Sequence, residues 1–335
     1  MRHVAMAMLL LIALAGTSPA SAGTPRAEAI TRLATEGKDV EAQAALVEVM
    51  QSRKVDAAEI QLFKDIVTAT KVDSAIRAGL IGNRIVHAGG AVGESEYPGV
   101  VALQVFQPFK KTWFTYCAGT LIGAQRVLTA GHCIDYGDEY VRVAYGSVDI
   151  AGPRIATVSV AKQVRHPAYA VQRVVHASGA EFDAANHDYG LVYLKESLQI
   201  APVALASNPD KASLDYGSLA RVVGWGLTEK GKPSPVLLYA DVPIVTDRAC
   251  AQSYSALDES TTFCAGYALG GADSCNGDSG GPIFASVNGA TVQIGVVSFG
   301  YGCGGANAYG VYAWIGAVLP WIAESTAGVR PKTQR

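Results

Sequence analysis

Two different spacings of apolar residues divide this chain. From residue 23 to 84 the sequence is rich in Ala, Glu, Val and Leu, has no cysteine, and has Phe63 as its single aromatic residue. Within this part Ile60, Phe63 and Val67 recur at i, i+3 and i+7, and residues 40–50 show similar spacing. This periodicity is typical of amphipathic helices, so residues 23–84 are predicted to form a small helical segment.

After Ile85 the apolar residues gather in short runs of strand length, such as "GVVALQVF", "RVVGWG" and "VQIGVVSFG". Turns rich in Gly, Pro, Asn and Asp separate them, as is typical of an antiparallel sandwich or barrel. An all-β region is therefore predicted. A final helix is expected to begin near Pro320, because proline is tolerated at the first helical position. Residues 327–335 are expected to form a flexible tail.

Composition narrows the class of protein. Half of the 335 residues are apolar and 17% are charged, which is enough apolar surface to bury a large core. The charges are interspersed and sum to a formal net charge of -2, so the chain has no basic stripe of the kind that binds nucleic acid. Nucleic acid is therefore not an expected partner.

The beginning of the chain has the pattern of a secretory signal. Arg2 precedes an apolar run from Val4 to Ala15, and residues 20–22, Ala-Ser-Ala, match a cleavage site after Ala22. The apolar run is shorter than the roughly 20 residues that a membrane-spanning helix needs. The mature protein is expected to be secreted, extracellular or periplasmic, with no membrane as a partner after the signal is removed.

Six cysteines fall in the last two thirds of the chain. An even number of cysteines in an exported protein predicts three disulfides, although the sequence alone does not choose among the possible pairings. No C-x-x-C or H-E-x-x-H spacing is present, so no metal and no cofactor are expected. The cysteines are Cys117, Cys133, Cys250, Cys264, Cys275 and Cys303.

A glycine-rich segment surrounds Ser279. Gly277-x-Ser279-x-Gly281 fits the nucleophile elbow of α/β-hydrolases, in which the histidine follows the serine along the chain. All six histidines of this sequence precede Ser279, which argues against an esterase or lipase of that type. His132, in "LTAGHC", and Asp188, in "NHDYGLVYL", are the upstream candidates for a base and an acid.

A series of segments in this order resembles trypsin-like serine proteases of the chymotrypsin superfamily: "RIVHAGG", "LTAGHC", "HDYGLVYL", "VVGWG", "DSCNGDSGGP", "VVSFGYGC" and "YGVY". The resemblance implies an all-β fold of two six-stranded antiparallel Greek-key barrels with a C-terminal helix. It also implies a secreted zymogen. Its parts would be a signal peptide at 1–22, a helical propeptide at 23–84, the protease domain at 85–326 and the tail at 327–335.

The resemblance gives catalytic roles to three residues. His132 is the expected base, because a serine hydroxyl such as that of Ser279 is a weak nucleophile until an imidazole takes its proton. Asp188 is expected to fix the tautomer of the imidazole and to stabilise its cation. The amides of Gly277 and Ser279 are expected to bind the developing oxyanion.

The resemblance also implies activation by proteolysis. Asp278 would pair with a new α-amino group at Ile85, released by cleavage after Arg84. Until that ion pair forms, the segment that carries Gly277 and Ser279, called the oxyanion loop below, would lack order. The uncut chain is therefore expected to be a poorly active precursor. His87 and Ala88 stand where most relatives carry a flexible pair such as Gly-Gly, so the local path of this terminus departs from the family pattern.

Asp273 matches the base of the family's primary specificity pocket. A carboxylate there favours an Arg or Lys side chain of the substrate, because a neutral side chain would leave the buried charge unpaired. If Asp273 is instead a solvated loop acid, the protease has a different primary specificity. Phe299 stands where tryptophan is usual, and Tyr309 where proline is usual. The substrate-binding residues implied with Asp273 are Ser274, Ser298, Phe299, Gly300 and Gly310.

The disulfides implied by the resemblance are Cys117–Cys133, Cys250–Cys264 and Cys275–Cys303. Polypeptide substrates and protein protease inhibitors are the expected partners, and a monomer is the expected state. The remaining histidines near the site are expected to be loop or surface residues, namely His166, His176 and His187.

The alternative function is a binding module that has kept this fold and lost catalysis. Such a protein is expected to lack His132, Asp188, Ser279 or a glycine of the oxyanion loop. The sequence retains all of them.

Overall fold

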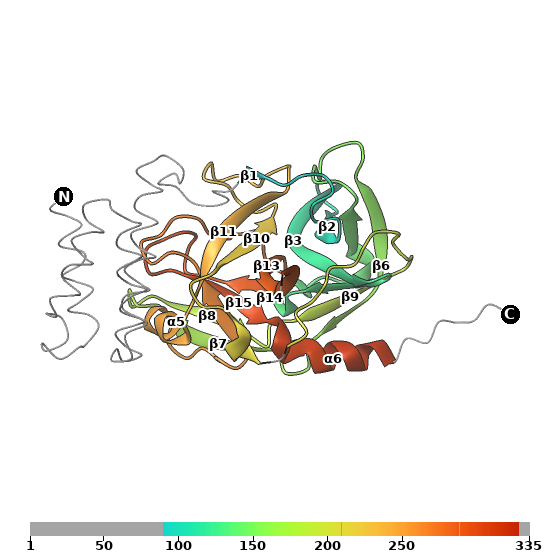
Figure 1. Cartoon of the computed structure of the whole chain (residues 1–335). Coiled ribbons are helices and arrows are strands. Elements are labelled where there is room, and N and C mark those ends of the chain that lie inside the picture. The colour runs from blue at the N-terminus through green and yellow to red at the C-terminus, as the bar shows by residue number, and fades with distance from the viewer. Residues whose placement is uncertain (1–89, 209, 288, 328–335) are drawn as a thin grey trace, which may run out of the picture. The chain divides into compact units, whose positions relative to one another are not determined.

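The computed structural model describes residues 90–327, apart from residues 209 and 288 (Figure 1). Several expectations concern residues outside these ranges: the signal segment, the helices of residues 23–84, and the cleavage site between Arg84 and Ile85. Among the described residues, no helix is both long and apolar enough to cross a membrane.

The first half of the described chain forms a closed antiparallel barrel with the strand order β2-β3-β4-β9-β6-β5. Apolar side chains of its strands point into the barrel, where Leu103, Leu121, Val143 and Leu191 are fully buried. Closure leaves no unpaired strand edge. The strands are β2 (Val100–Gln107), β3 (Thr112–Gly123), β4 (Arg126–Thr129), β5 (Val141–Tyr145), β6 (Ala156–Arg165) and β9 (Gly190–Leu194).

The second half forms a sheet with the order β1-β11-β10-β13-β14-β15-β12. Because β11 also pairs with β12, six of these strands close into a second barrel, and β1 lies outside it against β11. The prediction of two six-stranded antiparallel barrels is confirmed. The strands are β1 (Gly90–Ala91), β10 (Leu219–Gly224), β11 (Leu238–Val245), β12 (Thr262–Ala265), β13 (Pro282–Val287), β14 (Ala290–Phe299) and β15 (Gly310–Trp314).

The two barrels share one continuous apolar core. The same cluster of buried side chains contains Leu121 and Leu191 of the first barrel and Val296 and Tyr312 of the second. One buried polar contact also crosses between the barrels, where the Thr120 hydroxyl donates to the Gln293 side-chain oxygen at 2.8 Å. Loops at this junction are therefore held from both sides.

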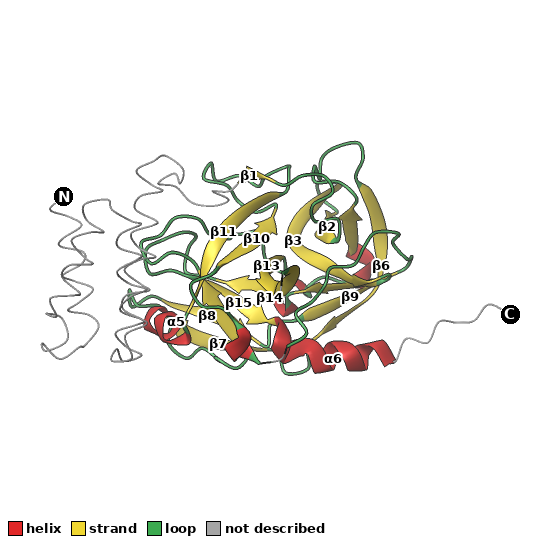
Figure 2. Cartoon of the chain, in the orientation of Figure 1, coloured by secondary structure: helices red, strands yellow, loops and turns green. Residues whose placement is uncertain are grey.

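In the part of the chain that the structure describes, helices are few, as Figure 2 shows. The α-helices are α5 (Asp247–Ser253) and α6 (Ile315–Ala327), and the short 3₁₀ turns are η1 (Gly131–Cys133), η2 (Asp138–Tyr140) and η3 (Lys211–Ser213). The N-terminus of α5 is capped by the Thr246 side chain, which accepts a hydrogen bond from the Ala249 amide.

The predicted start of the last helix at Pro320 is wrong, because α6 begins at Ile315 and contains the proline. An internal proline costs a helix about 3 kcal/mol. Ile315 and Val318 are both fully buried at the end of the second barrel, and each such side chain contributes about 1.5–3 kcal/mol on burial. Their burial offsets the cost of the proline and extends the helix by more than one turn.

A two-stranded hairpin was not predicted. It comprises β7 (Ala170–Val175) and β8 (Glu181–Asn186), which lie in sequence between β6 and β9 of the first barrel. Its buried residues Val174 and Ala184 nevertheless pack in a cluster with Tyr254 and Val311 of the second half. The hairpin therefore fastens the first barrel to the second.

Three disulfides are present, with the pairing that the family resemblance implied: Cys117–Cys133, Cys250–Cys264 and Cys275–Cys303. The first ties β3 to η1. The third ties the segment before Ser279 to the loop after β14.

Candidate active site

His132 lies in the η1 turn directly after β4. The chain turns sharply here because Gly131 has no side chain. A Cβ at Gly131 would lie 2.6 Å from the Tyr169 ring and 3.0 Å from the Tyr189 carbonyl oxygen. The turn is therefore packed tightly against the loop after β6 and the start of β9, and it presents the imidazole from a rigid support.

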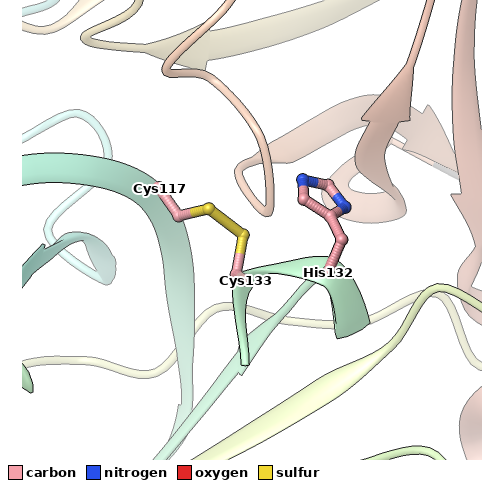
Figure 3. Close-up of side chains that lie close together, drawn as sticks. All are labelled: Cys117, His132 and Cys133. Carbon is pink, nitrogen blue, oxygen red and sulfur yellow. A yellow bond between two sulfur atoms is a disulfide. The ribbon is translucent and has the colours of Figure 1, made fainter. Parts of the chain in front are cut away.

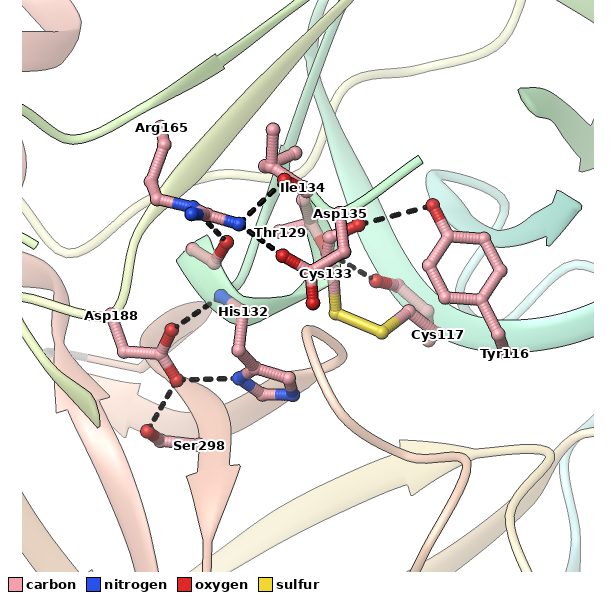
Figure 4. Close-up of a disulfide and its surroundings, with 12 residues drawn as sticks. Tyr116, Cys117, Thr129, His132, Cys133, Ile134, Asp135, Arg165, Asp188 and Ser298 are labelled. Atoms are coloured by element: carbon pink, nitrogen blue, oxygen red, sulfur yellow. Dashed lines mark hydrogen bonds and ion pairs between the residues drawn. A yellow bond between two sulfur atoms is a disulfide. The ribbon is translucent and has the colours of Figure 1, made fainter. Parts of the chain in front are cut away.

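The structure brings His132 and Asp188 together, as predicted (Figure 4). One carboxylate oxygen accepts the His132 backbone amide at 2.8 Å, and the other contacts Nδ1 of the ring at 2.8 Å. The Ser298 hydroxyl donates to this second oxygen at 2.5 Å. Asp188 is only 1% exposed, so three hydrogen bonds replace the water that its charge would otherwise hold.

The pair shifts both ionisation equilibria. Burial lowers the pKa of His132, but the hydrogen bond and the negative charge of Asp188 outweigh it, and the pKa is raised overall. Burial raises the pKa of Asp188, but the hydrogen bond and charge of His132 outweigh it, and the pKa is lowered. Asp188 is therefore an anion near neutral pH. It holds the proton on Nδ1 and leaves Nε2 as the basic nitrogen of the ring.

Ser279 comes from the loop between β12 and β13, in the second barrel. Its carbonyl oxygen accepts the Ala118 amide of β3 at 2.8 Å. At the next residue, a Cβ on Gly280 would lie 2.1 Å from the Thr129 hydroxyl and 2.5 Å from the Ala118 carbonyl oxygen. The serine segment is thus pressed against the two strands that lead to the His132 turn and its disulfide. Ser279 itself is half-buried.

The backbone before Ser279 has the conformation that glycine permits. Gly277 has φ +98°, where a side chain would be strained. Asp278 is fully buried, and its two oxygens accept the amides of Gly226 at 2.8 Å and Cys275 at 2.9 Å. A Cβ at Gly226 would lie 2.5 Å from the carboxylate. The Asp278 carboxylate therefore organises the loop that carries Gly277 and Ser279.

Asp273 is 3% exposed, which contradicts a solvated loop acid. Its oxygens accept the amides of Ser274 and Gly304, each at 2.8 Å. A Cβ at Gly310 would lie 2.9 Å from the same carboxylate, whereas a Cβ at Gly300 would meet no atom closer than 3.6 Å. Glycine at 310 is thus required for the carboxylate to lie where it does, and position 300 has more room.

Buried tyrosines lie near Asp273. Tyr312 is fully buried, and its hydroxyl lies 3.4 Å from that of Ser274. Burial and the nearby Asp273 charge raise the pKa of Tyr312, so its phenol stays neutral. Tyr309 is also buried, and its carbonyl oxygen accepts the Tyr254 hydroxyl at 2.7 Å.

The expectation that His176 is a surface residue is wrong. It lies at the tip of the β7–β8 hairpin, is 6% exposed, and stacks on Tyr301 with 4.2 Å between ring centroids. Its Nε2 donates to the Asn307 carbonyl oxygen at 3.0 Å. Sequence analysis missed this contact. The valine-rich run "AVQRVV" and the polar-apolar alternation at the start of "EFDAAN", on either side of a glycine-containing turn, are the signal that predicts a hairpin.

Of the other two histidines near the site, His187 matches the expectation of a loop or surface residue and His166 does not. His187 lies in the loop before Asp188, as expected, with φ +47°. His166 is half-buried rather than exposed, because its ring stacks on His187 at 5.4 Å and meets the edge of Trp321 at 4.8 Å.

One group of potential metal ligands occurs among the described residues, namely His132 with Cys117 and Cys133 (Figure 3). Their ligand atoms lie within 4.8 Å of one another. The two cysteines are joined in a disulfide, however, and a cysteine binds a metal ion as a free thiolate. The group therefore offers one imidazole and no ligand set.

Comparison with known proteins identifies a family and several relatives of this chain. A family profile described as Trypsin matches residues 89–322. Trypsin-1 of Astacus astacus is 34% identical over 241 residues, covering 68% of this chain and 94% of that protein. Trypsin 5G1 of Aedes aegypti is 37% identical over 218 residues, covering 62% and 74% respectively. Serine proteinase stubble of Drosophila melanogaster is 37% identical over 222 residues, covering 62% and 27%.

Proposed function

Because the chain belongs to the trypsin family and is a serine endopeptidase, we propose that it cleaves peptide bonds after Arg and Lys through an acyl-enzyme on Ser279. We propose further that cleavage between Arg84 and Ile85 activates it. The buried Asp188 carboxylate, with His132 held by two hydrogen bonds, is the observation that supports catalysis most directly.

In the proposed reaction, the Ser279 hydroxyl attacks the carbonyl carbon of the substrate while its proton passes to Nε2 of His132. A C–O bond forms and the carbonyl oxygen becomes an oxyanion, which the amides of Gly277 and Ser279 bind. As the C–N bond breaks, the imidazolium returns the proton to the leaving amine. Water then attacks the acyl-enzyme in the same way, with His132 again taking the proton. The ester bond to Ser279 breaks, the serine regains its proton, and the carboxylic acid product is released. Asp188 keeps its charge throughout and stabilises the imidazolium.

Asp273 supports a preference for basic side chains. Its carboxylate is buried, accepts the backbone amides of Ser274 and Gly304, and lies close to Gly310. The cation of an Arg or Lys side chain would add a charge partner to this buried carboxylate. A substrate that cannot do this loses roughly 3–5 kcal/mol of that stabilisation. Ser274, Ser298, Phe299 and Gly310 are proposed to line the same binding site.

Asp278 supports activation by proteolysis. A free α-amino group at Ile85 would pair with this buried carboxylate and so fix the loop that binds the oxyanion. Export by the signal at residues 1–22, secretion of a precursor and inhibition by protein protease inhibitors belong to the same proposal.

The test compares the intact chain with a chain that begins at Ile85, on peptide substrates that differ only in Arg, Lys, Phe or Ala before the cut. The Ile85 chain is expected to be far more active, with Arg and Lys preferred about a thousandfold over Phe. Ser279→Ala serves as the inactive control. Equal turnover by both chain forms would refute the activation step, and a preference for Phe would refute the role of Asp273.

A further inference from the structure

Arg165 contacts both ends of the turn that carries His132. It is the last residue of β6, and its Nε donates to the Gly131 carbonyl oxygen at 2.8 Å, directly before His132. Its Nη2 donates to the Ile134 carbonyl oxygen at 2.5 Å and also forms an ion pair with Asp135 (Figure 4). One guanidinium therefore spans the whole η1 turn.

The same guanidinium lies over the ring of Tyr169, 4.6 Å from its centroid. That ring is the group against which a Cβ at Gly131 would collide. Arg165, Tyr169 and the turn thus form one packed stack. A planar guanidinium can donate to two carbonyl oxygens at once, whereas a lysine ammonium is a point charge on a flexible stem.

We propose that Arg165 is a positioning residue for the catalytic base, holding the His132 turn so that the imidazole stays aligned between Asp188 and Ser279. This inference rests on the proposed triad mechanism. Arg165 touches neither substrate nor the reacting atoms in this role, and it acts through the turn.

Asp135 completes the arrangement by balancing the charge of Arg165. The charged and titratable groups around His132 are Asp188, Asp135 and Arg165, with the Tyr169 phenol beside them. Burial lowers the pKa of His132, the hydrogen bond and charge of Asp188 raise it, Asp135 raises it further, and Arg165 lowers it. Removing one member of the Arg165–Asp135 pair therefore leaves the other uncompensated beside the base.

The test uses Arg165→Met, Arg165→Lys, Asp135→Asn and the double variant Arg165→Met/Asp135→Asn in the activated enzyme. Each preparation is normalised by titration with a reagent that acylates Ser279. For Arg165→Met, kcat is expected to fall by about tenfold or more, with KM unchanged. The loss should not exceed the ~10²–10⁴ that general base catalysis contributes in total. Arg165→Lys is expected to recover little, because it cannot bridge both carbonyl oxygens.

The pH profile of kcat/KM separates positioning from mere folding. His132 must be neutral to act as a base, so a higher pKa moves the acid limb to higher pH. Arg165→Met is expected to shift the limb up, Asp135→Asn to shift it down, and the double variant to lie between them. Arg173→Met is the matched control, because that arginine forms an exposed ion pair with Asp183 on the β7–β8 hairpin. It is expected to behave as wild type.

The inference fails if Arg165→Met keeps wild-type kcat and acid limb, or if Arg165→Lys restores both. If Arg165→Met yields no folded enzyme, Arg165→Lys and Asp135→Asn still decide between these results. Hydrolysis that persists in Ser279→Ala would instead overturn the proposed function. An inactive Ser279→Ala alongside unaffected Arg165 variants would overturn this inference alone.

Discussion

The Ser298 hydroxyl lies 2.5 Å from the same Asp188 oxygen that contacts the His132 ring. Ser298 lies near the end of β14 in the second barrel, whereas Asp188 lies just before β9 of the first. The carboxylate is thus held by both halves of the protein. Any relative shift of the barrels would therefore change the contacts of this carboxylate directly.

Removing the Ser298 hydroxyl should weaken catalysis without abolishing it. Hydrogen bonds to charged groups contribute about 1.5–3 kcal/mol, and Asp188 keeps two others. For Ser298→Ala we expect kcat to fall about tenfold to a hundredfold, measured with a peptide substrate that has Arg directly before the cleaved bond. The exposed Ser213→Ala should retain full activity. Wild-type kcat in Ser298→Ala would show that the hydrogen bond does not support the carboxylate.

Replacing Asp188 by Asn should be far more damaging. The amide cannot hold the proton on Nδ1 as a carboxylate does, and kcat is expected to fall about 10⁴-fold. Asp188 raises the pKa of His132 against the effect of burial, so its loss lowers that pKa. Activity requires neutral His132, and the acid limb of the residual activity should therefore move to lower pH. Stopped-flow or steady-state profiles of kcat/KM would reveal the opposite shift if this account is mistaken.

A methyl group at Gly226 should disable the oxyanion loop. Its Cβ would lie 2.5 Å from the Asp278 carboxylate, which must move or lose its hydrogen bonds. For Gly226→Ala we expect at least a hundredfold loss of kcat/KM, since one oxyanion donor is worth about 10²–10³ in kcat. Gly123→Ala is the matched control, because its Cβ meets nothing closer than 3.6 Å. Comparable losses in the two variants would contradict the role given to Asp278.

His176→Ala should loosen the hairpin and destabilise the whole domain. The change leaves the Asn307 carbonyl oxygen without its imidazole donor and removes the stacking on Tyr301. We expect the free energy of unfolding to fall by about 1–3 kcal/mol in denaturant titrations. Val171→Ala, on the exposed face of the same hairpin, should change it by less than about 0.5 kcal/mol. A similar effect of both substitutions would show that the hairpin is not anchored through His176.

Those parts of the site that depend on short, contiguous segments could be predicted from the sequence. The order of "LTAGHC", "NHDYGLVYL" and "DSCNGDSGGP" along the chain carries the family resemblance, and it is this resemblance that implies the two barrels. The contacts of Arg165 and His176 could not be predicted in this way. Each depends on which carbonyl oxygen a segment distant in sequence presents. For Arg165 this is decided within the first barrel, and for His176 where the hairpin packs on the second half.

The misplaced start of α6 has a similar cause. The preference of proline for the first helical position is a local effect, whereas the burial of Ile315 against the second barrel is a tertiary effect. Sequence periodicity alone therefore underestimates elements whose stability comes from what they cover.

The β7–β8 hairpin begins and ends on one barrel and is fastened to the other, through Val174, His176 and Gln172. These contacts resist separation of the two halves, so the groups that each half contributes to the proposed active site are held at fixed relative positions.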